Sequence, residues 1–157
     1  MKTRRAIQLA LGLRSERGAA LVEFALVVPF LMLMMCATID FGLAVYTLNN
    51  LTAAAREGGR YGAALDFKQP ATDSLAVRDR VYGYIVGMNT GLTVAQVQAK
   101  IVVTLPVAAN GTQTNGGNVT VKINGYPYKP VTPLAIAFGL GTISLNRVAI
   151  FRWERST

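Results

Sequence analysis

Hydrophobic positions in this chain fall into one long run near the N-terminus and several short alternating runs after it. No charged residue lies between Phe24 and Ile39, and the apolar character continues to Tyr46, an aromatic residue typical of a membrane interface. A helix needs roughly 20 apolar residues to cross the ~30 Å hydrocarbon core of a bilayer. The pattern therefore predicts a transmembrane segment over about residues 24–46, inside a longer helix over residues 19–62. Pro29 is expected to bend this helix, and the glycines near its end are expected to loosen or terminate it.

After this helix the pattern changes to the shorter elements of a small domain, which we place at residues 63–157. A helix is expected over residues 75–87, capped by Asp73 or Ser74. Its apolar residues recur at the spacing of one helix face: Val77, Val81, Tyr84 and Ile85. A further helical turn is expected at residues 93–98, with Thr93 as its cap.

The last third of the chain alternates in the manner of strands. Strands are expected over residues 100–107, 118–128 and 142–154, because these segments are rich in β-branched residues and the first two flank two Asn-Gly pairs. In the second strand the inward positions are Val119, Val121 and Ile123. In the third, Ile143 and Leu145 alternate out of phase with Val148 and Ile150, which predicts a bulge near Asn146. The fold class expected is α+β: a long transmembrane helix followed by one or two helices on a three- to four-stranded antiparallel sheet.

Charge changes the picture at the N-terminus. The chain has a formal net charge of +8, and half of that excess lies in residues 1–18, a basic leader with five basic residues and one acid. Basic residues before an apolar span favour retention of that end on the cytoplasmic side. The basic residues of the exported domain are scattered rather than clustered among aromatics, so the sequence predicts no nucleic-acid partner.

The residues that most often carry catalysis are scarce. The chain contains no histidine, its one cysteine (Cys36) lies inside the apolar run, and none of its serines stands in a nucleophile motif. We therefore expect no enzyme activity, no metal site, no cofactor and no small-molecule substrate. Cys36 is interpreted as a small apolar residue of the membrane helix rather than a lipid-attachment site, because Met34 and Met35 precede it.

Gly18, Ala19, Glu23 and Phe24 form a candidate processing site at the boundary between the basic flank and the apolar helix. A glycine before the cleaved bond would let the backbone extend into a protease. After cleavage, the Glu23 carboxylate could pair with the N-terminal ammonium of a neighbouring subunit and so reduce the cost of placing both charges in lipid. The alternative is an uncleaved anchor whose Glu23 reaches the cytoplasmic headgroups.

Three segments of the chain resemble one family. Residues 17–29 (RGAALVEFALVVP) resemble the start of the TadE-like proteins, minor pilins or pseudopilins of Tad/Flp tight-adherence pilus systems. Residues 39–42 (IDFG) and 53–61 (AAAREGGRY) match the same pattern, and residues 149–154 resemble the family's last strand more weakly. The resemblance is dense over residues 17–62 and thin across the domain that follows.

The resemblance implies a substrate of a prepilin peptidase, cut after Gly18, that leaves Glu23 as the fifth mature residue. It implies a single-pass protein of the inner membrane with a cytoplasmic N-terminus and a periplasmic domain, at the base of a pilus or within it. The implied partners are the prepilin peptidase, other Tad pilins, inner-membrane platform proteins and membrane lipid. The mature chain would be too long for a major Flp pilin, and the absence of a large C-terminal domain favours the TadE-like type over TadG.

Asp40 is the second unexpected charge. It either contacts a basic residue of a partner helix or lies near the outer interface, where it can reach water. It falls on a different face of the helix from Glu23, so the two acids are not expected to form one site. The sequence favours the pilin-like interpretation over three rivals: a periplasmic enzyme, a secreted protein with residues 1 to about 37 as signal peptide, and an uncleaved anchored binding or scaffold protein.

Overall fold

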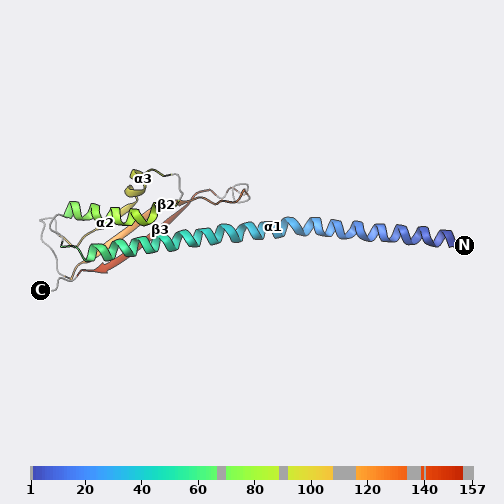
Figure 1. Cartoon of the computed structure of the whole chain (residues 1–157), viewed down its shortest axis with the longest axis horizontal. Helices are drawn as coiled ribbons and strands as arrows, with labels where there is room; N and C mark the ends of the chain where they lie inside the picture. The colour runs from blue at the N-terminus through green and yellow to red at the C-terminus, as the bar shows by residue number, and fades with distance from the viewer. Residues whose placement is uncertain are drawn as a thin grey trace.

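The protein has one very long helix with a small domain packed on its C-terminal part (Figure 1). The structure is a computed structural model that describes residues 2–66, 70–88, 92–107, 116–133, 139 and 141–153, with side chains from residue 18 onward. Helix α1 spans Lys2–Ala63, so it begins well before the expected start at Ala19. The leader contains no proline, and its Ala, Leu, Gln and Arg residues favour helix. The helix also continues through Pro29 without a break (Figure 1).

Two further helices follow. Helix α2 spans Pro70–Ile85 and buries Val77, Val81 and Ile85, as the helical spacing predicted. Its start was predicted wrongly: Pro70, not Asp73 or Ser74, opens it, because proline is pre-organised for the first helical position. Helix α3 spans Val94–Ala99, and the predicted cap is confirmed, since the Thr93 side chain accepts a hydrogen bond from the Gln96 amide in a capping box.

The described strands form a three-stranded antiparallel sheet in the order β1-β2-β3. They are β1 (Ile101–Thr104), β2 (Asn118–Tyr128) and β3 (Ile143–Arg152). The α+β fold class is therefore confirmed. β2 has the predicted bounds and buries the three predicted inward residues, Val119, Val121 and Ile123. The expected Asn-Gly turn between the first two strands, at residues 110–118, lies largely outside the described residues.

The predicted phase change in β3 is wrong. Arg147, Ala149 and Phe151 continue the inward face of Leu145, while Val148 and Ile150 lie exposed on the outer face. Arg147 tolerates its inward position because its Nε atom donates a hydrogen bond to the Thr52 hydroxyl of α1 at 3.1 Å. The irregularity in register does lie opposite Asn146, but the extra residue belongs to β2. There Gly125 adopts φ 62°, and its amide donates to the Asn146 side-chain oxygen at 2.7 Å.

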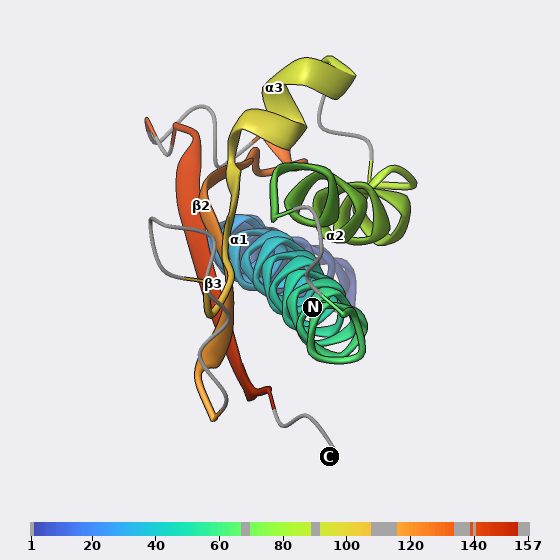
Figure 2. The same ribbon diagram turned by 90° about the vertical axis from the view of Figure 1, so that its left-hand side faces the viewer.

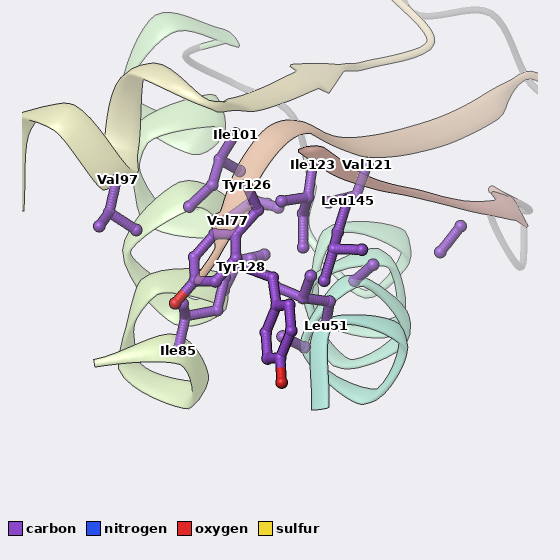
Figure 3. Close-up of a cluster of buried hydrophobic side chains, with 14 residues drawn as sticks. Leu51, Val77, Ile85, Val97, Ile101, Val121, Ile123, Tyr126, Tyr128 and Leu145 are labelled. Atoms are coloured by element: carbon purple, nitrogen blue, oxygen red, sulfur yellow. The ribbon is translucent and has the colours of Figure 1, made fainter. Parts of the chain in front are cut away.

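Helices α1 and α2 lie side by side on one face of the sheet, as the view along α1 shows (Figure 2). Their common core joins side chains of α1, α2 and the inner face of the sheet (Figure 3). From α1 it takes Leu51, Ala54 and Ala55. The domain therefore uses the C-terminal part of α1 as one of its own core helices, whereas the N-terminal part extends away from it (Figure 1).

Candidate functional site: the exposed half of α1 and its junction with the domain

The four residues of the candidate processing site lie together on the bare part of α1. Gly18, Ala19 and Glu23 are exposed, and Phe24 is 66% exposed. No atom outside the local helix lies within 4 Å of a side chain built at Gly18. No described part of the domain covers this segment, so it is accessible to another protein.

Glu23 carries the only carboxylate between Gly18 and Ile39. Within the described part of the chain, it makes neither a hydrogen bond nor an ion pair. Its neighbours on the exposed helix include Leu21, Val22, Leu26 and Val27, all apolar. A charged side chain in an apolar membrane environment is costly unless it finds a partner or reaches water. The carboxylate of Glu23 is therefore available to a group from outside this chain.

Asp40 lies where the domain first meets α1. Its Oδ1 atom accepts hydrogen bonds from the amide of Val131, at 2.8 Å, and from the amide of Thr132, at 3.2 Å. The Thr132 hydroxyl donates to the other carboxylate oxygen. The Tyr128 hydroxyl donates to the backbone carbonyl of Asp40 at 2.8 Å. Asp40 thus ties the segment after β2 to the side of α1.

The same contact affects Tyr128. Its phenol is buried, and burial together with the nearby Asp40 carboxylate raises the pKa of Tyr128 above its ordinary value. Both causes disfavour a phenolate, the first through loss of hydration and the second through like-charge repulsion. The hydroxyl therefore keeps its proton and remains a donor to the α1 carbonyl.

The structure does not bring Glu23 and Asp40 together. Seventeen residues separate them on one helix, a rise of about 25 Å at 1.5 Å per residue. Glu23 lies on the bare part of α1 and Asp40 at the junction with the domain. They are two separate features, and the contact of Asp40 with a partner helix stays a prediction.

Beyond Asp40, glycines let α1 approach the domain closely. A side chain at Gly58 would collide with Val81 of α2, and one at Gly59 would collide with the Phe151 ring of β3. At Gly62 an added Cβ would lie 2.8 Å from Cγ1 of Val119. The glycines were expected to loosen or terminate α1. The helix ends at Ala63, directly after Gly62, and the three glycines are also contact points with the domain.

The exposed N-terminal half of α1 and the segment that packs on the domain through Gly58 and Gly59 both fall within one family match. Residues 18–60 match the family model of TadE-like proteins. The match begins at Gly18 and ends close to the C-terminal end of α1, so the TadE-like segment contains the exposed apolar half, the Asp40 junction and most of the packing surface. The resemblance expected from the sequence is confirmed over this segment. No match to the chain was found among curated proteins or among solved structures.

The TadE-like segment also contains the part of α1 with the length and hydropathy of a membrane span. Within Gly18–Ala63, an apolar window with a mean hydropathy of 2.3 is wholly unburied. One such helix suggests a single membrane anchor. Among the described residues, no cluster of three or more His, Cys, Asp or Glu side chains could hold a metal ion.

Sequence reasoning missed the other side of the Asp40 contact. Val131 and Thr132 follow β2 with no motif that marks them as partners of an acid some 90 residues earlier. Sequence also missed the cleft beside this contact, about 640 Å³ in volume, between α1, the end of α2 and the end of β2. Tyr84 was expected in the core but is 51% exposed and lines this cleft instead.

Proposed function

We propose that this protein is a minor pilin or pseudopilin that takes part in assembling a Tad/Flp-type pilus for adhesion. It is anchored in the inner membrane by one pass of α1, with the N-terminus in the cytoplasm and the domain in the periplasm. A prepilin peptidase cuts it after Gly18. Its role is structural, through contacts with other Tad pilins and inner-membrane platform proteins, without catalysis.

One observation carries this proposal: the TadE-like segment coincides with a helix that is bare and apolar in its first half and packed on a domain in its second. The bare half has the length of a membrane span and leaves the candidate processing site uncovered. The packed half shares its hydrophobic core with the domain, which links the membrane segment to the domain through one continuous helix.

Processing would give Glu23 a defined role. Removal of residues 1–18 creates an ammonium group at Ala19, four residues before Glu23 on the same helix. A neighbouring copy or related pilin can offer the same ammonium group to the unpaired Glu23 carboxylate. Pairing would offset the desolvation of both charges and would align adjacent helices at a fixed height.

The decisive test is the N-terminal sequence and intact mass of the membrane-extracted protein, with and without its prepilin peptidase. A mature end at Ala19 that depends on the peptidase is the expected result. Gly18→Val should block cleavage, because the added isopropyl group would not fit a narrow protease site that accepts glycine before the cleaved bond. Gly42→Val is the matched control, since Gly42 is also exposed on α1 with open space around it.

Two other N-terminal residues of the extracted protein would contradict the proposal. An intact Met1 in the presence of the peptidase would leave an uncleaved anchored binding or scaffold protein. An end near Ala37, with the protein free in the periplasm, would leave a secreted domain.

The two acids can be tested separately. Glu23→Gln should leave membrane insertion intact and lower pilus assembly, because the neutral amide cannot pair with an ammonium group. Asp40→Asn retains an acceptor for the amides of Val131 and Thr132, removes the charge, and replaces the oxygen that accepts from the Thr132 hydroxyl with an NH2 group. If pilus output is unchanged in Asp40→Asn, the partner-helix role of Asp40 fails while the role of Glu23 stands.

A further inference from the structure

The cleft beside the Asp40 junction lies between three elements. One wall is formed by residues of α1 that include Tyr46 and Asn50, and a second by the end of α2 with Tyr84. The third wall follows β2 and includes Lys129 and Val131. Its volume of about 640 Å³ is within the range of small-molecule sites. The cleft combines aromatic side chains with the cation of Lys129, and Tyr128 of the common core also lines it.

The Asp40 contact indicates the height of this cleft relative to a membrane. Residues 129–132 have no regular secondary structure, and irregular backbone exposed to lipid is not tolerated within the hydrocarbon region. Because Asp40 binds the amides of Val131 and Thr132, the hydrocarbon region must end before Asp40. The segment from Ala19 to Ile39 rises about 30 Å as helix, which equals the thickness of that region. The span then ends before the limit at residue 46 expected from hydropathy.

With this placement, the cleft opens at the level of the lipid headgroups. Leu43 and Tyr46 rise about 6 Å and 10 Å beyond Ile39. The headgroup layer is roughly 5–8 Å deep on each side of a bilayer, and any tilt of α1 lowers both residues toward it. The mouth of the cleft is therefore continuous with the apolar surface that α1 exposes to the membrane.

The residues around the cleft suit this level. Val131 is 66% exposed, and Tyr46 and Tyr84 are exposed as well. Tyrosine is enriched where one end of a side chain meets lipid and the other meets water. Lys129 is exposed and forms no ion pair with any described residue. The Asp40 carboxylate at the adjoining junction is already bonded to the Val131–Thr132 segment.

We propose that this cleft binds the phosphate headgroup of a phospholipid in the leaflet where α1 emerges toward the domain. The ammonium group of Lys129 pairs with the phosphate, and the hydroxyls of Tyr46 and Tyr84 lie at the same level to donate hydrogen bonds. The upper acyl chain follows Leu43 and Val131. The bound lipid fixes the domain against the membrane surface at one height and one rotation about α1. This inference rests on the membrane anchor in the proposed function, but it requires neither processing nor a pilus.

A reporter variant can measure how close the cleft lies to headgroups. Tyr84→Trp places an exposed indole in the cleft, while native Trp153, the only tryptophan of the chain, is buried and serves as an internal reference. The full chain is placed in phosphatidylcholine nanodiscs that contain a lipid with a nitroxide on its headgroup. Val148→Trp is the matched control, because Val148 is exposed on the outer face of the sheet.

The expected result is strong quenching of the tryptophan at position 84 and little quenching at position 148. Near-ultraviolet circular dichroism should show that both variants keep the parent fold. Equal quenching at the two positions would overturn the proposal. So would an unquenched position 84 that can be cross-linked to a second copy of the chain, since the cleft would then receive a helix instead of lipid.

The charge of Lys129 is tested by native mass spectrometry of the detergent-extracted protein during titration with dioleoyl-phosphatidylglycerol. Lys129→Gln should weaken lipid retention about fivefold, the effect of one cation near an anionic headgroup. Lys122→Gln is the control, because Lys122 is exposed on the outer face of β2 and should leave retention unchanged. Equal lipid retention in the two variants would show that Lys129 does not bind the phosphate and would overturn the proposal.

Two further results separate the possible sources of failure. Inorganic phosphate should not displace the lipid at matched concentration, because it lacks the acyl chain. Equal competition would mean that the cleft binds free phosphate, and the lipid proposal would fall. A protein that does not remain in nanodiscs at all would overturn the anchor and the cleft together, whereas a protein that remains with position 84 unquenched would overturn the cleft alone.

Discussion

The two halves of α1 are continuous in backbone but face different surroundings. From Gly18 to Ile39 its large apolar side chains are exposed, whereas from Leu51 onward it contributes fully buried residues to the core of the domain. The glycines show the same contrast. Gly18 and Gly42 have open space around them, but Gly58 and Gly59 have no room for a side chain. The comparison teaches that one helix can be selected for two surroundings, with exposed apolar bulk for one half and close contact for the other.

The largest expected difference between the halves is in the effect of removing a leucine side chain. Leu51→Ala opens a cavity in the core of α1, α2 and the sheet, and we expect it to lower the free energy of unfolding of the domain by about 2–5 kcal/mol. Leu31→Ala, on the exposed half, should leave that free energy unchanged. Urea unfolding in detergent, followed by the fluorescence of buried Trp153, measures both. Similar losses in the two variants would contradict the division of α1.

Adding a methyl group should have a smaller effect and opposite signs in the two halves. Gly58→Ala forces the new Cβ against Val81, at a cost of about 1–3 kcal/mol in the free energy of unfolding, partly offset by the better helix propensity of alanine. Gly42→Ala meets no neighbour and should stabilise the helix slightly. The same urea titration tests both variants. A neutral Gly58→Ala would mean that α1 and α2 are less closely packed than described.

The junction between the halves should respond to alkaline pH. Tyr128→Phe removes the hydrogen bond to the Asp40 carbonyl and should cost about 0.5–1.5 kcal/mol at neutral pH. Because folding raises the pKa of Tyr128, its contribution is fully present below the unfolded value of about 10 and is lost as pH rises through the folded pKa. The parent should therefore lose more stability than Tyr128→Phe between neutral and strongly alkaline pH. Parallel pH profiles would exclude this role. Tyr46→Phe, which changes an exposed phenol of α1, is the control.

The smallest effect is expected at the surface of the packed half. Arg80 of α2 donates to Glu57 of α1 at 3.0 Å, a contact that raises the pKa of Arg80, and it lies over the Tyr61 ring at 5.8 Å to the centroid. Solvent screens this exposed pair, so Arg80→Gln should lower the melting temperature only slightly, and less at high salt. Arg56→Gln, a neighbouring exposed arginine of α1, is the control. A large and salt-independent loss would show that the pair contributes more than its exposure indicates.

Several features could be predicted from the sequence because they depend only on neighbours along the chain. The apolar run, the cap at Thr93 and the alternation of Val119, Val121 and Ile123 all follow from local periodicity and were found where expected. The candidate processing residues were also readable, because a glycine and an isolated acid beside an apolar run stand out in any context. Their role is still untested.

Other features required the arrangement in space. The inward position of Arg147 depends on Thr52 of α1. Apolar alternation alone selected Val148 and Ile150, which lie on the outer face of β3. The need for glycine at position 58 comes from Val81, a residue of another helix. Neither partner is near in sequence, so no local pattern could have identified it.

The sequence alone determined that one long apolar helix precedes a small α+β domain, because hydrophobic periodicity reflects the local cost of exposing apolar groups to water. It also determined that Glu23 and Asp40 are exceptional, because charge in an apolar run is expensive wherever the run lies. Only the tertiary structure decided what surrounds each acid. Glu23 lies on a bare helix with no described partner, whereas Asp40 receives the amides of Val131 and Thr132. The reason is physical: hydrogen bonds between distant segments form only when folding brings their donors and acceptors within about 3 Å.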